Sequence, residues 1–381
     1  MTELRVVVPA GIDDPARPSG GNSYDRRICR GLTAAGWQLV EQPVAGDWPW
    51  PDPAARAALA RTIAAVPDGA VLLVDGLIAS GSPALLVPAA SRVRLVVLVH
   101  LPLGVEPLGV EPAGIEPLGV EPLGVEPAGQ SARQVAVRAG ERAVLCAARA
   151  VLTTSEWSRG WLLEEYRLPP EQVEVAAPGV DAAGLAPGTP AGDQLLCVAA
   201  VTPVKGHDLL LAALAGVADL PWHCDWVGSL DRDPEFVTRL RRQAAAAGLA
   251  DRVRLTGPRT GADLDRGYAE ADVLVLASRA ETYGMVVTEA LARGLPVIAP
   301  AVGGLPETVG GTTAGGFRPG LLVPAADPVA LAGALRAWLT DAELRQRLRQ
   351  AARQRRAELA GWDSTTAAIA RVLRRVAAQQ P

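Results

Sequence analysis

Short apolar runs alternate along this chain with longer segments whose apolar residues recur at helical spacing. In the first half, runs rich in Val and Leu predict buried strands, and helical segments follow them, as at 132–148. These predicted strands span residues 4–9, 70–75, 94–100, 150–154 and 172–176. Strands that alternate with helices are typical of parallel sheets with helical crossovers, so the pattern predicts an α/β fold.

The same pattern returns in the second half of the chain. Its predicted strands span residues 195–200, 222–227, 253–256, 273–277 and 296–300. Residues 182–192, between the two series, are rich in Gly, Pro and Ala and indicate a linker. We therefore predict two Rossmann-like domains, over residues 1–185 and 193–358, followed by a final helical segment over 359–381. Ligands of open parallel sheets bind beyond the carboxyl ends of the strands, so two facing domains place the ligand between them.

A repeat interrupts the first domain. From residue 103 to 127 the pentapeptide Leu-Gly-Val-Glu-Pro occurs five times, with Ala-Gly-Ile-Glu-Pro as its third copy. Proline at every fifth position excludes a helix and interrupts a strand, and the evenly spaced glutamates favour solvation. We predict an extended or disordered loop, with a gating or partner-binding role as the alternative.

Composition narrows the class of protein. The net charge is -4, with 37 basic and 41 acidic residues, which argues against a nucleic-acid partner. The longest apolar runs are far shorter than the ~20 residues of a membrane helix. The chain passes from Met1 directly into a strand-like run, so we expect a cytoplasmic protein without a signal peptide. The four cysteines lack metal-ligand or redox spacing and are expected to be buried, reduced thiols: Cys29, Cys146, Cys197 and Cys224.

The segment at 280–307 is the richest in candidate chemistry. It follows a predicted strand and opens a helix near Met285, and Gly284 permits close approach of the backbone. The free N–H groups and positive dipole at a helix start suit an anion such as a pyrophosphate. Glu281 and Glu289 would repel a phosphate, so we expect them to accept hydrogen bonds from sugar and ribose hydroxyls. The alternative is an ordinary strand-helix unit with solvated glutamates.

Residue usage singles out one cation. Lys205 is the only lysine among the 37 basic residues, and it follows the first predicted strand of the second domain. Where arginine replaces lysine everywhere else, the retained ammonium indicates a specific role. The alternative is a solvated charge.

Glu281 and Glu289, separated by seven residues, resemble the E-x7-E motif of retaining glycosyltransferases of family 4. The flanking residues 277–278, 294–299 and 303–307 match that family too. The resemblance implies the GT-B fold of two Rossmann-like domains, with a donor-binding C-terminal domain, an acceptor-side N-terminal domain and a last helix that crosses back to the first domain.

The resemblance extends to Lys205 and to the first domain. It implies that Lys205 binds the donor pyrophosphate and neutralises the leaving group, although the family's arginine is missing from residues 200–204. Arg259 is a candidate replacement. Residues 19–22 resemble the family's first glycine loop, and His100 ends a strand where the family often places a histidine near the donor sugar. The alternative for residues 19–22 is a simple turn in which Asn22 caps the following helix, and the alternative for His100 is a structural histidine.

We therefore predict glycosyl transfer with retention of configuration, from a nucleotide diphosphate sugar and without metal or cofactor. The predicted catalytic residues are Lys205, Glu281 and His100. The predicted donor-binding residues are Gly20, Gly21, Asn22, Thr202, Arg259, Thr282, Tyr283, Gly284, Met285, Val286 and Glu289. Asp231 and Asp233 resemble a metal-binding Asp-x-Asp, which we do not favour.

The acceptor stays open: a small molecule or glycan, or a lipid-linked acceptor in a membrane that the arginine-rich end of the chain would contact peripherally. That end is otherwise a solvated helix face. A nucleotide-sugar epimerase or nicotinamide enzyme is the alternative from another class, but residues 19–22 do not supply Gly-x-Gly-x-x-Gly. A non-enzymatic sugar-binding protein of two lobes is a further alternative, but it would normally carry an export signal, which we do not expect here.

Overall fold

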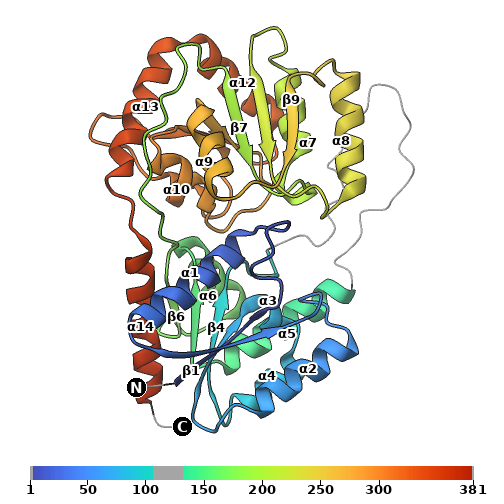
Figure 1. Cartoon of the computed structure of the whole chain (residues 1–381), viewed down its shortest axis with the longest axis vertical. Helices are drawn as coiled ribbons and strands as arrows, with labels where there is room; N and C mark the ends of the chain where they lie inside the picture. The colour runs from blue at the N-terminus through green and yellow to red at the C-terminus, as the bar shows by residue number, and fades with distance from the viewer. Residues whose placement is uncertain (1–2, 106–131, 380–381) are drawn as a thin grey trace.

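The computed structural model describes residues 3–105 and 132–379, so most of the pentapeptide repeat lies outside the described residues. Each half of the chain forms a six-stranded, all-parallel sheet with helices on its faces (Figure 1). The predicted pair of α/β domains is confirmed.

The first sheet has the strand order β2-β1-β3-β4-β5-β6. Its strands are β1 (Glu3–Pro9), β2 (Gln38–Val44), β3 (Val71–Asp75), β4 (Arg94–Val99), β5 (Ala150–Thr153) and β6 (Val173–Val175). Its helices are α1 (Gly20–Ala34), α2 (Pro53–Ala64), α3 (Gly76–Ser80), α4 (Pro83–Ala89), α5 (Ala132–Ala147) and α6 (Glu156–Tyr166).

The second sheet has the strand order β12-β11-β10-β7-β8-β9. Its strands are β7 (Gln194–Val198), β8 (His223–Val227), β9 (Val253–Gly257), β10 (Val273–Val275), β11 (Val297–Pro300) and β12 (Gly320–Val323). Its helices are the 3-10 turn η1 (Pro203–Lys205), α7 (His207–Ala215), α8 (Pro234–Ala246), α9 (Gly261–Glu270), α10 (Met285–Ala292), α11 (Leu305–Val309), α12 (Pro328–Thr340) and α13 (Ala342–Arg356).

The strand order of each sheet reverses at one place, between β1 and β3 in the first and between β7 and β10 in the second. Connections that leave neighbouring strands toward opposite faces open a crevice at such a point. The loops that follow β7 and β10, residues 199–206 and 276–284, contain most of the chemistry predicted from the sequence.

The last helix, α14 (Trp362–Ala378), packs on the first domain although it follows the second in sequence (Figure 1). Its buried residues Ile369, Leu373 and Val376 belong to the same apolar cluster as β1 and α1. Thr365 Oγ1 also donates to the backbone carbonyl of Ala177 at 2.8 Å. Within the described ranges, no helix combines the length and apolar character needed to span a bilayer.

Local details differ from the sequence predictions. Ser19, and not Asn22, caps α1: the Ser19 hydroxyl accepts from the Asn22 backbone N–H at 3.1 Å. Cys146 is exposed on α5, so the prediction of a buried thiol is wrong there, whereas the other three cysteines are buried. The edge strands β2 and β12 are not predicted from the sequence; β2 contains Glu41 and Pro43, which its place at the edge of the sheet tolerates.

Candidate active site

The loop after β10 joins the two domains. Thr282 Oγ1 donates to the backbone carbonyl of His100 at 2.8 Å, and the Tyr283 hydroxyl donates to the carbonyl of Pro178 at 3.1 Å. The Glu307 carboxylate of α11 accepts from two backbone N–H groups at the start of α6, both at 3.2 Å. The end of β4 and the Glu281–Glu289 segment are therefore in direct contact across the cleft.

Glycines shape this loop and leave the start of α10 uncapped. Gly284 precedes the eight-residue helix in the left-handed region, with φ at 82°, and no side chain caps the N-terminus. A Cβ on Gly303 or Gly304 would lie 1.8 Å or 2.0 Å from the carbonyl oxygens of Glu281 and Thr282. Close backbone packing therefore fixes the loop, and the first N–H groups of α10 stay available to an anion.

Lys205 and Glu281 form an ion pair at the carboxyl edge of the second sheet. Lys205 Nζ lies 2.7 Å from Glu281 Oε2, and both side chains are partly exposed. Arg279, in the same loop as Glu281, donates to both carboxylate oxygens of Asp208, at 2.8 and 2.6 Å, and to the carbonyl of Pro203 at 2.6 Å. Arg279 thus joins this loop to η1 and α7.

Glu289 lies one turn into α10 against a buried tyrosine. The Tyr268 hydroxyl donates to Glu289 Oε2 at 2.7 Å, and the Arg293 guanidinium packs over the Tyr268 ring at 4.6 Å. Burial raises the pKa of Glu289, while the Tyr268 hydrogen bond and the Arg293 charge act in the opposite direction. One carboxylate oxygen is thus held by the protein.

A cavity of about 490 Å³ between the domains receives this carboxylate. Of the residues predicted from the sequence, Asn22, Arg259, Met285 and Glu289 line it. The other predicted residues lie outside its lining: Gly20, Gly21, His100, Thr202, Lys205, Glu281, Thr282, Tyr283, Gly284 and Val286. The residues predicted from the sequence therefore fall into two parts, a cavity around Glu289 and a group around Lys205 and Glu281 on the N-terminal side of α10.

Family models match both domains of this architecture. The model described as glycosyl transferases group 1 matches residues 190–355, and the model described as a glycosyl transferase 4-like domain matches residues 3–179. The chain belongs to glycosyltransferase family 4. The prediction from the E-x7-E segment is confirmed, and with it the GT-B type of fold.

Relatives and solved structures agree with this assignment. The D-inositol 3-phosphate glycosyltransferases of Salinispora tropica and Kineococcus radiotolerans are 35% and 36% identical over 250 and 261 residues. These matches cover 59% and 62% of this chain but only 51% and 59% of the relatives, so the chain spans little more than half of their length.

Two solved structures share the fold. Sucrose-phosphate synthase from Thermosynechococcus elongatus superposes with a TM-score of 0.77 at 23% identity, covering 99% of both chains. HepE from Anabaena, in complex with UDP-glucose, gives a TM-score of 0.73 at 16% identity, covering 98% of this chain and 100% of its own.

Three side chains near the site had no sequence signal of their own. Tyr268, Asp25 and Asp75 belong to α9, α1 and β3, and only the fold brings them to Glu289 and His100. Each would be unremarkable in its own helix or strand. The Asp-x-Asp at 231–233 is separate: Asp233 caps α8, accepting from the Phe236 N–H at 2.8 Å.

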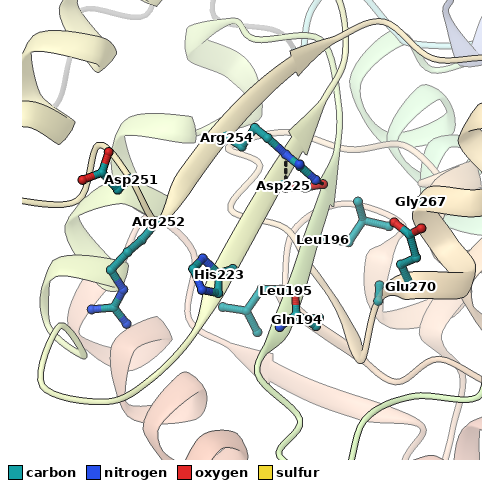
Figure 2. Close-up of a pocket in the computed structure, with 11 residues that line it drawn as sticks. Gln194, Leu195, Leu196, His223, Asp225, Asp251, Arg252, Arg254, Gly267 and Glu270 are labelled. Carbon is teal, nitrogen blue, oxygen red and sulfur yellow. Dashed lines mark hydrogen bonds and ion pairs between the residues drawn. The ribbon is translucent and has the colours of Figure 1, made fainter.

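Another cavity, of about 230 Å³, lies at the amino ends of β7, β8 and β9 (Figure 2). Its two arginines already have partners: Arg254 pairs with Asp225, and Arg252 donates to the carbonyls of Ala218 and Trp222 at 2.8 and 3.2 Å. This is the edge of the sheet opposite the loops that carry Lys205 and Glu281. The residues predicted to carry the family chemistry therefore lie at the cleft between the domains and not in this cavity.

Proposed function

We propose that this member of family 4 transfers a sugar from a nucleotide diphosphate to an acceptor, with retention of configuration and without a metal. The observation that carries the proposal is the arrangement around the start of α10. Lys205 and Glu281 lie on one side of the uncapped helix end, and Glu289 lies one turn into the helix, lining the cavity.

Each group has a role that its charge suggests. The N–H groups of α10 and the Lys205 ammonium would bind the diphosphate, and the Glu289 carboxylate would accept the ribose hydroxyls. Negative charge grows on the departing diphosphate as the sugar becomes oxocarbenium-like, and a fixed cation stabilises it there. Because Glu281 pairs with Lys205, the donor phosphate would compete with this carboxylate for the ammonium.

The relatives suggest which substrates to test first. HepE was crystallised with UDP-glucose, and the curated relatives act on an inositol phosphate according to their names. We therefore propose a UDP-linked hexose as the first donor and a small phosphorylated polyol as the first acceptor.

A lipid acceptor is less well supported. In the arginine-rich end of the chain, Arg345 is buried and donates to the Trp338 and Leu339 carbonyls, and Arg349 pairs with Asp272 at 2.7 Å. These arginines stabilise the second domain, which leaves fewer charges for a membrane surface.

Incubation with a panel of nucleotide sugars tests the proposal. We expect one donor to raise the melting temperature and to release nucleoside diphosphate slowly, and we expect Lys205→Met to slow the release by about 10²–10³ while the protein stays folded. Absence of binding and release with every UDP-, GDP-, ADP- and dTDP-sugar would refute the proposal. Proton NMR of the product then reports whether the anomeric configuration is retained.

A further inference from the structure

A cluster of three ionisable side chains, two buried aspartates and the partly exposed His100, lies beneath the glycine loop of the first domain. His100 Nε2 is 2.7 Å from Asp25 Oδ1 and 3.7 Å from Asp75 Oδ2, and both carboxylates are about 95% buried. Asp25 comes from α1, Asp75 from the end of β3 and His100 from the residue after β4. The other oxygen of Asp75 caps α3, accepting the backbone N–H of Leu77 at 2.8 Å.

The positive charge that compensates the two aspartates of this cluster comes from His100. In the described part of the chain, neither carboxylate forms an ion pair with an arginine or lysine, so His100 is the cation available to both. An uncompensated buried carboxylate is costly, which favours a protonated His100 beside Asp25. Among the described residues, the other titratable groups near it include Tyr24, whose ring meets the His100 ring edge-on at 5.1 Å, and Tyr283, which acts on Tyr24 across the cleft. The buried Cys29 thiol also lies near, and burial, followed by neighbouring charges that include Asp25, raises the pKa of this thiol.

Ionisation of both carboxylates beside one imidazolium leaves one buried negative charge uncompensated, which costs free energy. Burial lowers the pKa of His100, but Asp25 and then Asp75 raise it by more, so its pKa lies above the ordinary value. Burial, followed by the Asp25 charge, raises the pKa of Asp75 to about 7. The cluster is therefore neutral while Asp75 holds a proton and carries one negative charge after Asp75 ionises.

The cluster also lies within the candidate site. A Cβ on Gly21 would be 3.2 Å from the His100 ring, and the His100 carbonyl accepts from Thr282 at 2.8 Å. The ring is thus enclosed between the glycine loop and the segment that holds Glu281. Negative charge on the cluster acts directly on an anionic ligand in this cleft.

We propose that Asp25 and Asp75 are positioning residues for His100: Asp25 holds it as an imidazolium, and ionisation of Asp75 weakens binding of the anionic donor. The inference rests on the proposed function for its consequence at the donor. It adds two residues to the site and makes donor binding depend on pH. A metal ion at the same three side chains is the competing interpretation.

Nitrogen NMR of labelled histidines tests the protonation state without any substrate. The chain has three histidines, and His100→Gln assigns the relevant signals. In the unaltered protein at pH 7.5, we expect both ring nitrogens of His100 to be protonated. In Asp25→Asn at the same pH, we expect the His100 signals of a neutral ring. Buried His207, whose pKa burial lowers to about 4, should be neutral in both proteins. A neutral His100 at pH 7.5 in the unaltered protein would overturn the inference, and so would a change in its signals on adding Zn²⁺ or EDTA.

The dissociation constant of a nucleoside diphosphate from pH 6 to 8.5 tests the consequence. UDP, GDP, ADP and dTDP are screened first, and the tightest ligand is used. A single charge at about 10 Å and an effective dielectric constant of about 20 changes binding by about tenfold. As pH rises, we expect the affinity of the unaltered protein for the nucleoside diphosphate to fall by this factor relative to the affinity of Asp75→Asn. Asp68→Asn, at an exposed aspartate paired with Arg92, is the matched control and should follow the unaltered protein.

Equal pH profiles for Asp75→Asn and the unaltered protein would overturn the inference while leaving the proposed function intact. If none of the four nucleoside diphosphates binds at any pH, the proposed function fails. The role of Asp75 at the donor fails with it, and the histidine spectra still decide the role of Asp25.

Discussion

At the scale of single residues, Tyr268 and Glu289 show how the fold prepares a carboxylate for a ligand. Tyr268 is fully buried and holds Glu289 Oε2 at 2.7 Å. A hydrogen bond to a charged group contributes roughly 1.5–3 kcal/mol, so Glu289→Ala should weaken donor use at least tenfold. We expect Tyr268→Phe to raise the donor KM by a smaller factor with little change in kcat. Steady-state kinetics measure both.

Glu270→Ala is the matched control for these two variants. Glu270 is an exposed glutamate of α9 that lines the other cavity, at the amino ends of the strands. Its removal should leave the donor kinetics unchanged. Unchanged kinetics in Glu289→Ala would refute the ribose assignment. A defect in Glu270→Ala would show that the donor binds in the cavity at the amino ends of the strands.

Asp75 carries a prediction about stability. Its pKa of about 7 in the folded protein exceeds the ordinary 3.8, so between these values the folded state holds a proton that the unfolded state has released. The free energy of unfolding therefore falls as pH rises through this window. Asn does not titrate and still caps a helix. The melting temperature of Asp75→Asn relative to the unaltered protein should be higher at pH 8 than at pH 4.5, and a constant difference would contradict the raised pKa.

At the scale of elements, the start of α10 depends on glycines in the following loop. A Cβ on Gly304 would lie 2.0 Å from the Thr282 carbonyl, whereas a Cβ on Gly311 meets nothing within 4 Å. Gly304→Ala should displace the loop at 281–284, lower the melting temperature and reduce kcat, because the loop carries Glu281. Gly311→Ala should change neither. Thermal unfolding and donor hydrolysis of the two variants test this, and equal behaviour would show that the loop is not fixed by close packing.

The position of Lys205 beside the N-terminus of α10 leads to a prediction that transfer requires no metal ion. If the ammonium and the N-terminus of α10 supply the electrostatic stabilisation, then Lys205→Met should lower kcat by about 10²–10³ and EDTA should leave transfer largely intact. Loss of activity in EDTA, restored by Mg²⁺ or Mn²⁺, would contradict the metal-free mechanism. It would direct attention to Asp231 and to the cluster at His100.

Sequence patterns identify elements where local signals are strong. The Val- and Leu-rich runs that became β3, β4 and β10 were readable because buried parallel strands are apolar on both faces. The edge strand β2 was not, because its exposed residues break the pattern. The cap of α1 was misassigned by three residues, since Ser19 and Asn22 are both good caps and only the backbone geometry distinguishes them.

At the scale of the whole molecule, the motif segments could be predicted and their partners could not. Glu281, in a loop, Glu289, one turn into α10, and Lys205, in η1, belong to segments whose sequence matches the family, so their neighbourhood followed from the topology of two facing sheets. His100 acquires its partners from α1 and β3, which are 75 and 25 residues away in sequence, through sheet order and helix packing. Interactions of this kind depend on the complete fold.

A crystal structure of this chain with the nucleoside diphosphate that binds it most tightly would locate the donor site directly. We predict that the two phosphates contact the backbone N–H groups of Met285 and Val286 and the Lys205 ammonium, which leaves Glu281, and that the ribose hydroxyls donate to Glu289. A nucleotide bound instead at the amino ends of β7 and β8, or in the cleft without contacts to Lys205 and Glu289, would contradict it.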